Sequence, residues 1–153
     1  RGVFLGTKHA IVEMLKTGGG AIVNTASDAG LIGTPMLSAY CASKGGVVMF
    51  TKATAMEWAR MGIRINCVCP GVIQTPILDP MLAMAKAAGA TPEQVWTQMG
   101  KTHPIGRVGQ PEEVAEAVAW LASDRASFVT GVALPVDGGL AGGMAPQASP
   151  FGG

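Results

Sequence analysis

Two short, largely apolar runs, residues 21–26 and 63–69, do most to limit the fold that this chain can adopt. A continuous apolar run of this length predicts a strand covered on both faces, as in a parallel sheet. Between the runs, Ser38 is a suitable N-cap for a helix over residues 38–61, and Gly62 is a suitable helix stop. Apolar residues at helical spacing predict a further helix over residues 3–15, which Gly18-Gly19-Gly20 should end.

The second half of the sequence continues this alternation. Thr91 and Gln94 form a capping-box pattern that predicts a helix to about Met99, and Pro111 opens another helix with acids in its first turn. Residues 132–136 predict a last strand. Strands separated by helices predict an α/β fold with right-handed crossovers, a Rossmann-like doubly wound parallel sheet. It is incomplete, because only three strands can be identified.

Composition fits one domain with a core and excludes several classes of partner. The chain has 153 residues, 48% of them apolar, and a net charge of +1 without basic or acidic runs. This argues against nucleic acid and membranes as partners, and no apolar run is long enough to span a bilayer. Three cysteines and two histidines give no metal-ligand pattern, so we expect no metal site and reduced thiols in a cytoplasmic protein. Cys67 and Cys69 alternate along the second apolar run, so we expect them on the same face of a strand.

The single tyrosine, Tyr40, stands four residues before Lys44. This spacing places both side chains on one helix face. An ammonium group favours the ionised form of a neighbouring phenol, and such a pair can act as a general base. Ser27, thirteen residues earlier, could hold a substrate oxygen beside the phenol. Alternatively, Tyr40 is a half-buried helix residue beside an exposed lysine.

Four motifs together resemble the short-chain dehydrogenase/reductase family. They are Ser27, the Tyr-Cys-Ala-Ser-Lys segment at 40–44, the segment 66–75 with its Pro-Gly turn, and Val-Asp-Gly-Gly at 136–139. The likeness implies one domain over residues 1–140 that interconverts an alcohol and a ketone with NAD or NADP. It implies catalytic roles for Ser27, Tyr40 and Lys44.

The resemblance also implies a set of cofactor-binding residues, namely Tyr40, Lys44, Pro70, Gly71, Ile73 and Thr75. For Pro70-Gly71 and Thr75, an ordinary strand-ending turn is the alternative. Gly45 and Gly46 predict a close approach by a ligand or by another backbone within the helix. The family commonly forms homo-oligomers, so we expect a dimer or tetramer.

Residues 76–103 resemble the variable substrate loop of the family. Their methionines favour an apolar alcohol or ketone, although these side chains could equally pack the helices onto the body. A fatty-acyl or steroid substrate is a further possibility, and His103 is expected to be a loop residue. The tail, residues 141–153, is rich in Gly, Pro and Ala and is expected to be flexible.

The glycine-rich phosphate-binding turn of the family has no match in this sequence, nor has its Asn-Asn-Ala-Gly segment. We therefore expect a C-terminal part of a dehydrogenase that by itself binds the cofactor weakly and tends to self-associate through an unpaired strand edge. The alternative is a catalytically silent fragment that acts only as an oligomerising or interaction module.

Overall fold

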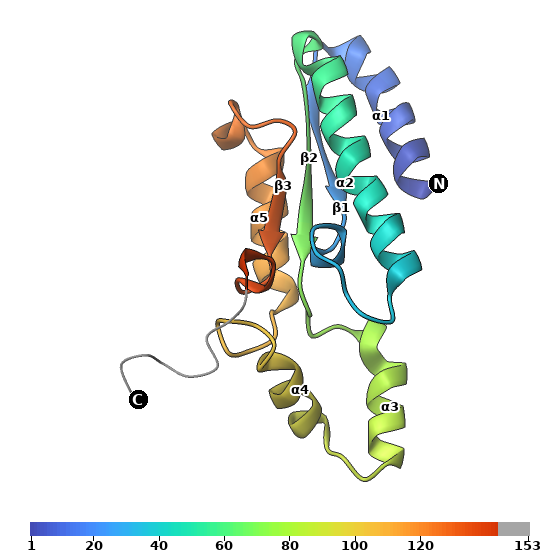
Figure 1. The fold of residues 1–153 in the computed structure, drawn as a ribbon. Helices are drawn as coiled ribbons and strands as arrows, with labels where there is room; N and C mark the ends of the chain where they lie inside the picture. Colours follow the sequence, from blue (N-terminus) through green and yellow to red (C-terminus); the bar gives the residue numbers. More distant parts are fainter. Residues whose placement is uncertain (144–153) are drawn as a thin grey trace.

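The computed structural model describes residues 1–143, which form a three-stranded parallel sheet with helices on both faces (Figure 1). The strands are β1 (Gly20–Thr25), β2 (Ile63–Pro70) and β3 (Ala133–Val136), in the order β1-β2-β3. Gly20 pairs with Ile63, and Cys67 pairs with Ala133. The predicted α/β fold, with its partial Rossmann-like sheet, is confirmed.

The central strand β2 divides the core into two faces because successive side chains alternate. Ile63 and Ile65 are fully buried against α1 (Gly2–Thr17) and α2 (Ser38–Trp58). Arg64 lies on the opposite face, where its guanidinium donates to the Leu121 carbonyl of α5 (Pro111–Ala122) at 2.8 Å. Thus α1 and α2 cover one face and α5 the other.

The predicted helix ends are confirmed, with one correction. Gly18 adopts a left-handed conformation (φ 86°) and closes α1, and Gly62 (φ 74°) closes the 3-10 turn Ala59–Met61 that follows α2. Ser38 is not the N-cap that the sequence predicted. The Leu37 carbonyl already accepts the Cys41 N–H at 2.8 Å, so Leu37 occupies the cap position and Ser38 is the first helical residue.

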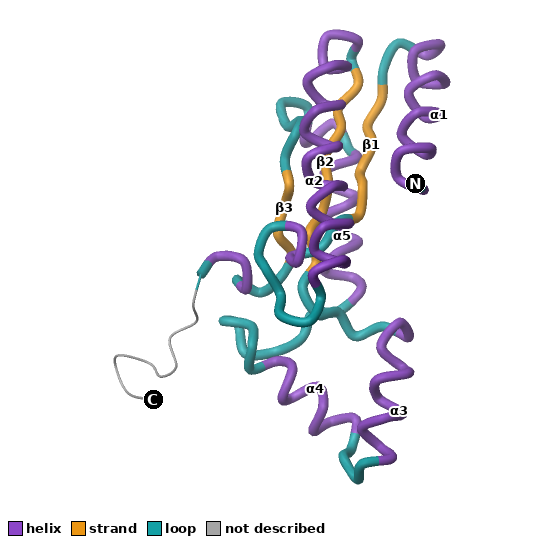
Figure 2. Tube along the Cα trace, turned by 45° about the vertical axis from the view of Figure 1, so that its right-hand side comes forward, coloured by secondary structure: helices purple, strands orange, loops and turns teal. Residues whose placement is uncertain are grey.

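The segment between β2 and α5 extends beyond the carboxyl end of the sheet (Figures 1 and 2). It contains a 3-10 turn (Pro76–Leu78), α3 (Asp79–Ala87) and α4 (Pro92–Gly100). The capping box predicted for Thr91 and Gln94 is present. Helix α3 was not predicted, although Pro80 in its first turn is typical of a helix start.

After β3, Asp137 accepts from the Gly139 N–H at 2.9 Å and from the Ala141 N–H at 2.7 Å. These bonds hold the 3-10 turn Leu140–Gly142. The predicted tail therefore begins within a defined turn, and residues 144–153 lie outside the described part of the chain.

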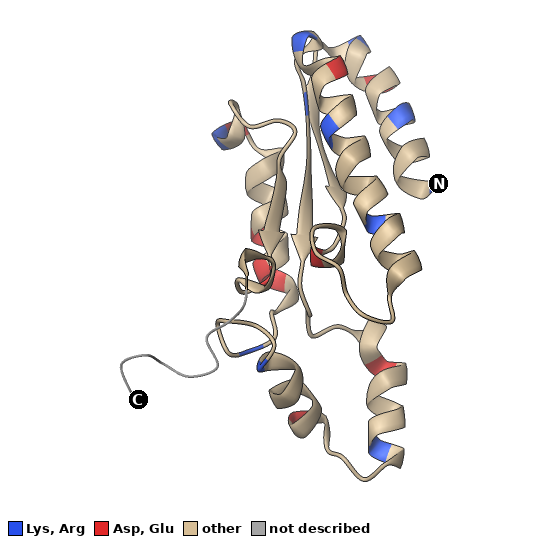
Figure 3. Cartoon of the chain, in the orientation of Figure 1, with Lys and Arg blue, Asp and Glu red and all other residues tan. Residues whose placement is uncertain are grey.

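Charged side chains of both signs are interspersed over the helices and loops (Figure 3). None of the helices within residues 1–143 has the length and apolar character needed to cross a bilayer. The same residues contain no cluster of three or more potential metal ligands.

Candidate active site

The three strands are parallel, so they end at one edge of the sheet, and that edge gathers the polar residues singled out above (Figure 1). Ser27 follows the end of β1 at Thr25, Pro70 ends β2, and Asp137 follows β3. Open α/β sheets bind ligands at this edge.

Ser27 is 7% exposed and begins the 3-10 turn Asp28–Gly30. Its hydroxyl donates to Asp28 Oδ1 at 2.7 Å and accepts the Ala29 N–H at 3.2 Å. The chain therefore fixes this oxygen in place, with its proton directed to a carboxylate.

Tyr40 and Lys44 lie one turn apart near the start of α2, as predicted. The Lys44 ammonium lies 5.6 Å from the centre of the Tyr40 ring and donates to the Thr25 carbonyl at 3.3 Å. The structure thus brings Lys44 to both Tyr40 and the end of β1. Tyr40 is 43% exposed, and within residues 1–143 no hydrogen bond joins its hydroxyl to Ser27 or Lys44.

The close approach predicted at Gly45 and Gly46 is made by a different glycine. A Cβ atom on Gly30 would lie 2.8 Å from the Lys44 carbonyl carbon, whereas one on Gly45 would meet only an ordinary contact at 3.7 Å. At Gly46 the space is open. Among protein contacts, the residue that must stay small for the turn after Ser27 to pack on α2 is therefore Gly30, in the loop. The approach of a ligand to Gly45 or Gly46 stays a prediction.

The chain bends at Val72 after β2 and then forms a short parallel pairing. Ile73 forms an isolated parallel bridge with Gly109, in which Gly109 donates to the Val72 carbonyl and accepts from the Gln74 N–H, both at 2.9 Å. In such a bridge the N–H and carbonyl of Ile73 itself point away from Gly109. These groups are therefore free to meet a ligand, apart from a long 3.4 Å contact of the Thr75 hydroxyl with the Ile73 carbonyl.

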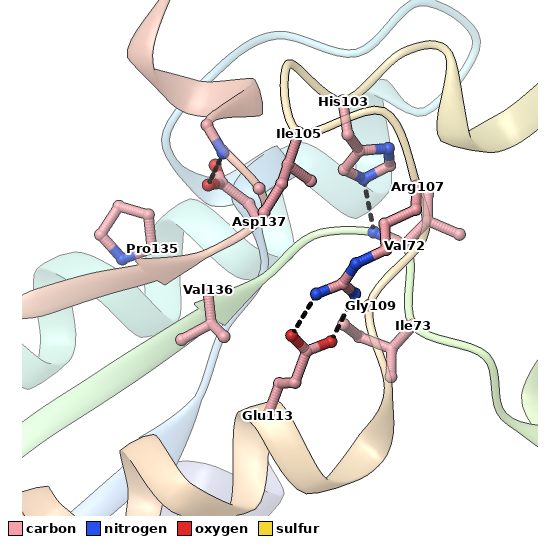
Figure 4. A pocket seen from close by; sticks show the side chains of 12 residues that line it. Val72, Ile73, His103, Ile105, Arg107, Gly109, Glu113, Pro135, Val136 and Asp137 are labelled. Carbon is pink, nitrogen blue, oxygen red and sulfur yellow. Dashed lines mark hydrogen bonds and ion pairs between the residues drawn. The ribbon is translucent and has the colours of Figure 1, made fainter.

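His103 lies in the loop after α4, as expected, and it is buried there (Figure 4). It is 3% exposed, and its Nε2 accepts the Val72 N–H at 3.1 Å. The burial and the partner were not predicted, because a histidine directly before proline at the end of the insert is a signal that does not reveal a contact with Val72.

A cavity of about 230 Å³ lies beside His103, between the ends of β2 and β3 and the start of α5 (Figure 4). Arg107 and Glu113 form a two-pronged ion pair there, with distances of 2.8 and 2.7 Å. Hydrogen bonds from Arg107 and from the Gln110 N–H lower the pKa of Glu113 to about 2. Since these polar groups are already paired, they offer little to a ligand.

Cys67 and Cys69 point to the same face of β2, as predicted, and both are fully buried in a cluster with Ala26 and Val48. The hydrogen bond shared with Cys67, together with burial, raises the pKa of Cys69. Cys69 therefore stays a neutral thiol. Cys41 is only half-buried and accepts the Thr34 N–H at 3.4 Å.

A family model described as enoyl-(acyl carrier protein) reductase matches residues 1–141. Cyclohexanol dehydrogenase of Acinetobacter sp. (strain SE19) is 52% identical over 136 residues, which cover 89% of this chain and 49% of that enzyme. The structure of ligand-free aldohexose dehydrogenase from Thermoplasma acidophilum matches with a TM-score of 0.84 and 39% identity, over 96% of this chain and 57% of that one. ElxO with NADP bound matches with a TM-score of 0.82 and 34% identity, over 93% and 54%.

The fold defines an α/β protein with a partial Rossmann-like sheet, whose strand ends carry the candidate site. The chain belongs to the short-chain dehydrogenase/reductase family, which confirms the resemblance read from its motifs. It spans about half the length of the curated relatives that it matches.

Proposed function

We propose that the protein is an NAD(P)-dependent oxidoreductase that interconverts an alcohol and a ketone, with Tyr40 as general acid/base. The observation that carries the proposal is the position of Lys44, whose ammonium lies against the Tyr40 ring and bonds the last carbonyl of β1. The relationship to cyclohexanol dehydrogenase gives further support.

Each of the three side chains has a separate task in this proposal. Tyr40, which is accessible to solvent, exchanges the hydroxyl proton with the substrate oxygen. Ser27 donates a hydrogen bond to that oxygen and stabilises its developing charge, for which its proton must turn away from Asp28. The Ala29 N–H can keep its bond to the Ser27 oxygen meanwhile, which holds the oxygen in position.

The residues present fit the nicotinamide end of NAD or NADP, which supplies or accepts the hydride when bound. Lys44 makes one hydrogen bond to the chain, so two of its three donors remain for ribose hydroxyls. The Ile73 backbone groups suit a carboxamide. Pro70 and Gly71 place this segment at the strand end, and the Thr75 hydroxyl lies beside it.

The phosphate end has no matching glycine-rich turn in this sequence. We therefore propose that the 153-residue chain alone binds either cofactor weakly. Titration with NADH and NADPH, followed by fluorescence, tests this, and tight saturable binding would contradict it.

We propose an apolar alcohol or ketone as the substrate. The helices beyond the sheet edge expose Ile77 and Met84, which are 82% and 75% accessible. Such side chains adapt to apolar ligands of irregular shape. Cyclohexanol dehydrogenase, the relative described above, is named for a small cyclic alcohol.

We further propose a homo-oligomer, a dimer or tetramer, in the cytoplasm. Support for association comes from exposed apolar side chains on α1 and α2, which include Phe4, Val12, Met49 and Met56. Support for the compartment comes from the three free cysteines, because disulfides are rare in reducing compartments.

The proposal is tested by Tyr40→Phe in the complete protein, assayed with cyclohexanol. Loss of a general acid/base should lower kcat/KM by about 10²- to 10⁴-fold while the fold remains intact. Ser38→Ala is the matched control, because it removes an exposed hydroxyl from the same helix turn. Retained activity in Tyr40→Phe would rule out the role assigned to Tyr40.

The alternative function is a catalytically silent assembly module. The same exposed apolar side chains favour it, as does the free edge of β1, which pairs only with β2 within residues 1–143. Under this alternative, size-exclusion chromatography gives a defined oligomer while cofactor and substrate assays stay blank.

A further inference from the structure

We propose that His103 is a positioning residue that holds residues 72–75 through its Nε2 atom and thereby sets the backbone groups offered to the cofactor. This inference deepens the proposed function and rests on it. His103 touches neither of the groups that would react. It acts through Val72.

The hydrogen bonds of the imidazole define its protonation. Nε2 accepts the Val72 N–H at 3.1 Å, so it carries no proton. The proton of the neutral ring is therefore on Nδ1, which lies 3.1 Å from both the Met99 carbonyl and the Thr102 hydroxyl. Both of those oxygens can accept it.

Val72 needs this acceptor because the chain bends there and leaves the hydrogen-bond ladder of the sheet. The Val136 carbonyl at the end of β3 accepts the N–H of the preceding residue, Gly71, at 3.1 Å, and within residues 1–143 no backbone carbonyl accepts the Val72 N–H. The His103 Nε2 atom is the acceptor instead. The Gly109 N–H donates to the Val72 carbonyl, so both backbone groups of Val72 are held by hydrogen bonds on one side.

This anchoring has a direct consequence for the following residue. Backbone groups alternate along an extended chain, so fixing Val72 on one side directs the Ile73 N–H and carbonyl to the other. Those are the groups that the proposed function assigns to the nicotinamide carboxamide. A loss of the His103 bond would let this segment rotate.

The imidazole ring of His103 is also closely packed by the turns beside it. A Cβ atom on Gly71 would lie 2.9 Å from Nε2, and one on Gly138 would lie 3.5 Å from the His103 Cβ. His103 is thus packed between the turns after β2 and β3. Its bond to Met99, in α4, joins the substrate-side insert to the same turn.

The first test is the tautomer, read from the ¹⁵N shifts of the imidazoles by NMR of the full 153-residue chain. His9, which is exposed on α1, is an internal reference for a ring without fixed partners. We expect the Nδ1–H tautomer of His103, with a scalar coupling across the hydrogen bond between its Nε2 and the Val72 N–H. The Nε2–H form would overturn the proposal, whatever the activity of the protein.

The second test compares His103→Leu with His103→Gln. Leucine has no acceptor, whereas the glutamine amide oxygen can replace Nε2. Leaving the Val72 N–H unpaired should accelerate its amide exchange and raise the KM for the nicotinamide cofactor by about tenfold, with a smaller change in kcat. Glutamine should restore both to within about threefold of the parent. Equal effects of the two variants, or a loss confined to kcat, would contradict a positioning role.

The two proposals can fail separately. If the parent protein turns over no alcohol or ketone with either cofactor, the proposed function fails, and the NMR tautomer and Val72 exchange still decide the role of His103. If turnover is normal but His103→Leu leaves the Val72 exchange and cofactor KM unchanged, only the inference about His103 fails.

Discussion

The Ser27 hydroxyl donates its proton to the Asp28 carboxylate at 2.7 Å, one residue along the chain. A serine that stabilises a substrate oxygen must instead direct that proton to the substrate. Asp28 therefore competes with the substrate for the Ser27 hydroxyl. Its charge makes it a strong competitor, because hydrogen bonds to charged groups are stronger than neutral ones.

Asp28→Asn should relieve this competition while keeping the size of the side chain. Hydrogen bonds to charged partners contribute about 1 kcal/mol more than neutral ones, so we expect kcat/KM for ketone reduction to rise about fivefold. Steady-state kinetics measure it, with Asp124→Asn in an exposed turn far along the chain as control. An unchanged or lower rate would show that the Asp28 bond does not limit Ser27.

Alanine at two glycine positions, Gly30 and Gly46, should have opposite effects on stability. Gly30→Ala places a Cβ 2.8 Å from the Lys44 backbone and should lower the free energy of unfolding by about 1–3 kcal/mol. Gly46→Ala meets open space inside α2 and should raise it by about 1 kcal/mol. Urea denaturation of the two variants and the parent gives the comparison. A stabilising Gly30→Ala would contradict the packing of this turn.

The three thiols should differ in reactivity because they differ in solvent accessibility. Cys67 and Cys69 are fully buried, so neither should react in the folded protein. The bond to Cys67 and burial also raise the pKa of Cys69, which keeps that thiol neutral. Ellman's reagent should titrate about one thiol in the native state and all three in denaturant. Cys41→Ser is the control and should abolish the native reaction. Rapid native labelling of that variant would mean that the β2 core opens.

The ion pair of Arg107 and Glu113 should stabilise the protein in a defined pH range. The pKa of Glu113 is lowered to about 2 in the folded protein, below the value of about 4.3 for a free glutamate. Its contribution is therefore fully present above about pH 5 and is lost as the pH falls toward 2.

The stability difference between the parent and Glu113→Gln should follow that range and shrink in 1 M salt, because both side chains are about half exposed. Glu112→Gln removes a carboxylate from the same helix turn without touching the ion pair and is the matched control. Thermal unfolding at several pH values measures both. A difference that persists at pH 2 would contradict the assignment.

Sequence patterns predicted the elements whose signals are local. The capping box at Thr91, the left-handed stops at Gly18 and Gly62, and the same-face pair Cys67 and Cys69 all depend on residues within a few positions of one another. The parallel sheet was also predicted, because strands separated by helices need crossover connections.

The errors have a different origin. Ser38 is a good cap residue, yet the turn before it places Leu37 at the cap position. The need for a small residue falls on Gly30 because of a contact with Lys44, fourteen positions away in the sequence. His103 bonds Val72 across 31 positions. No local pattern reports such contacts.

The amino-acid pattern was enough to predict the alternation of strands and helices, the parallel sheet, and the spacing that puts Tyr40 and Lys44 on one helix face. The folded chain was needed to show that Lys44 reaches the Thr25 carbonyl, that Asp28 accepts the Ser27 proton, and that His103 accepts the Val72 N–H. Periodicity and capping act over one or two helical turns, whereas the bonds of Lys44 and His103 join segments 19 and 31 positions apart.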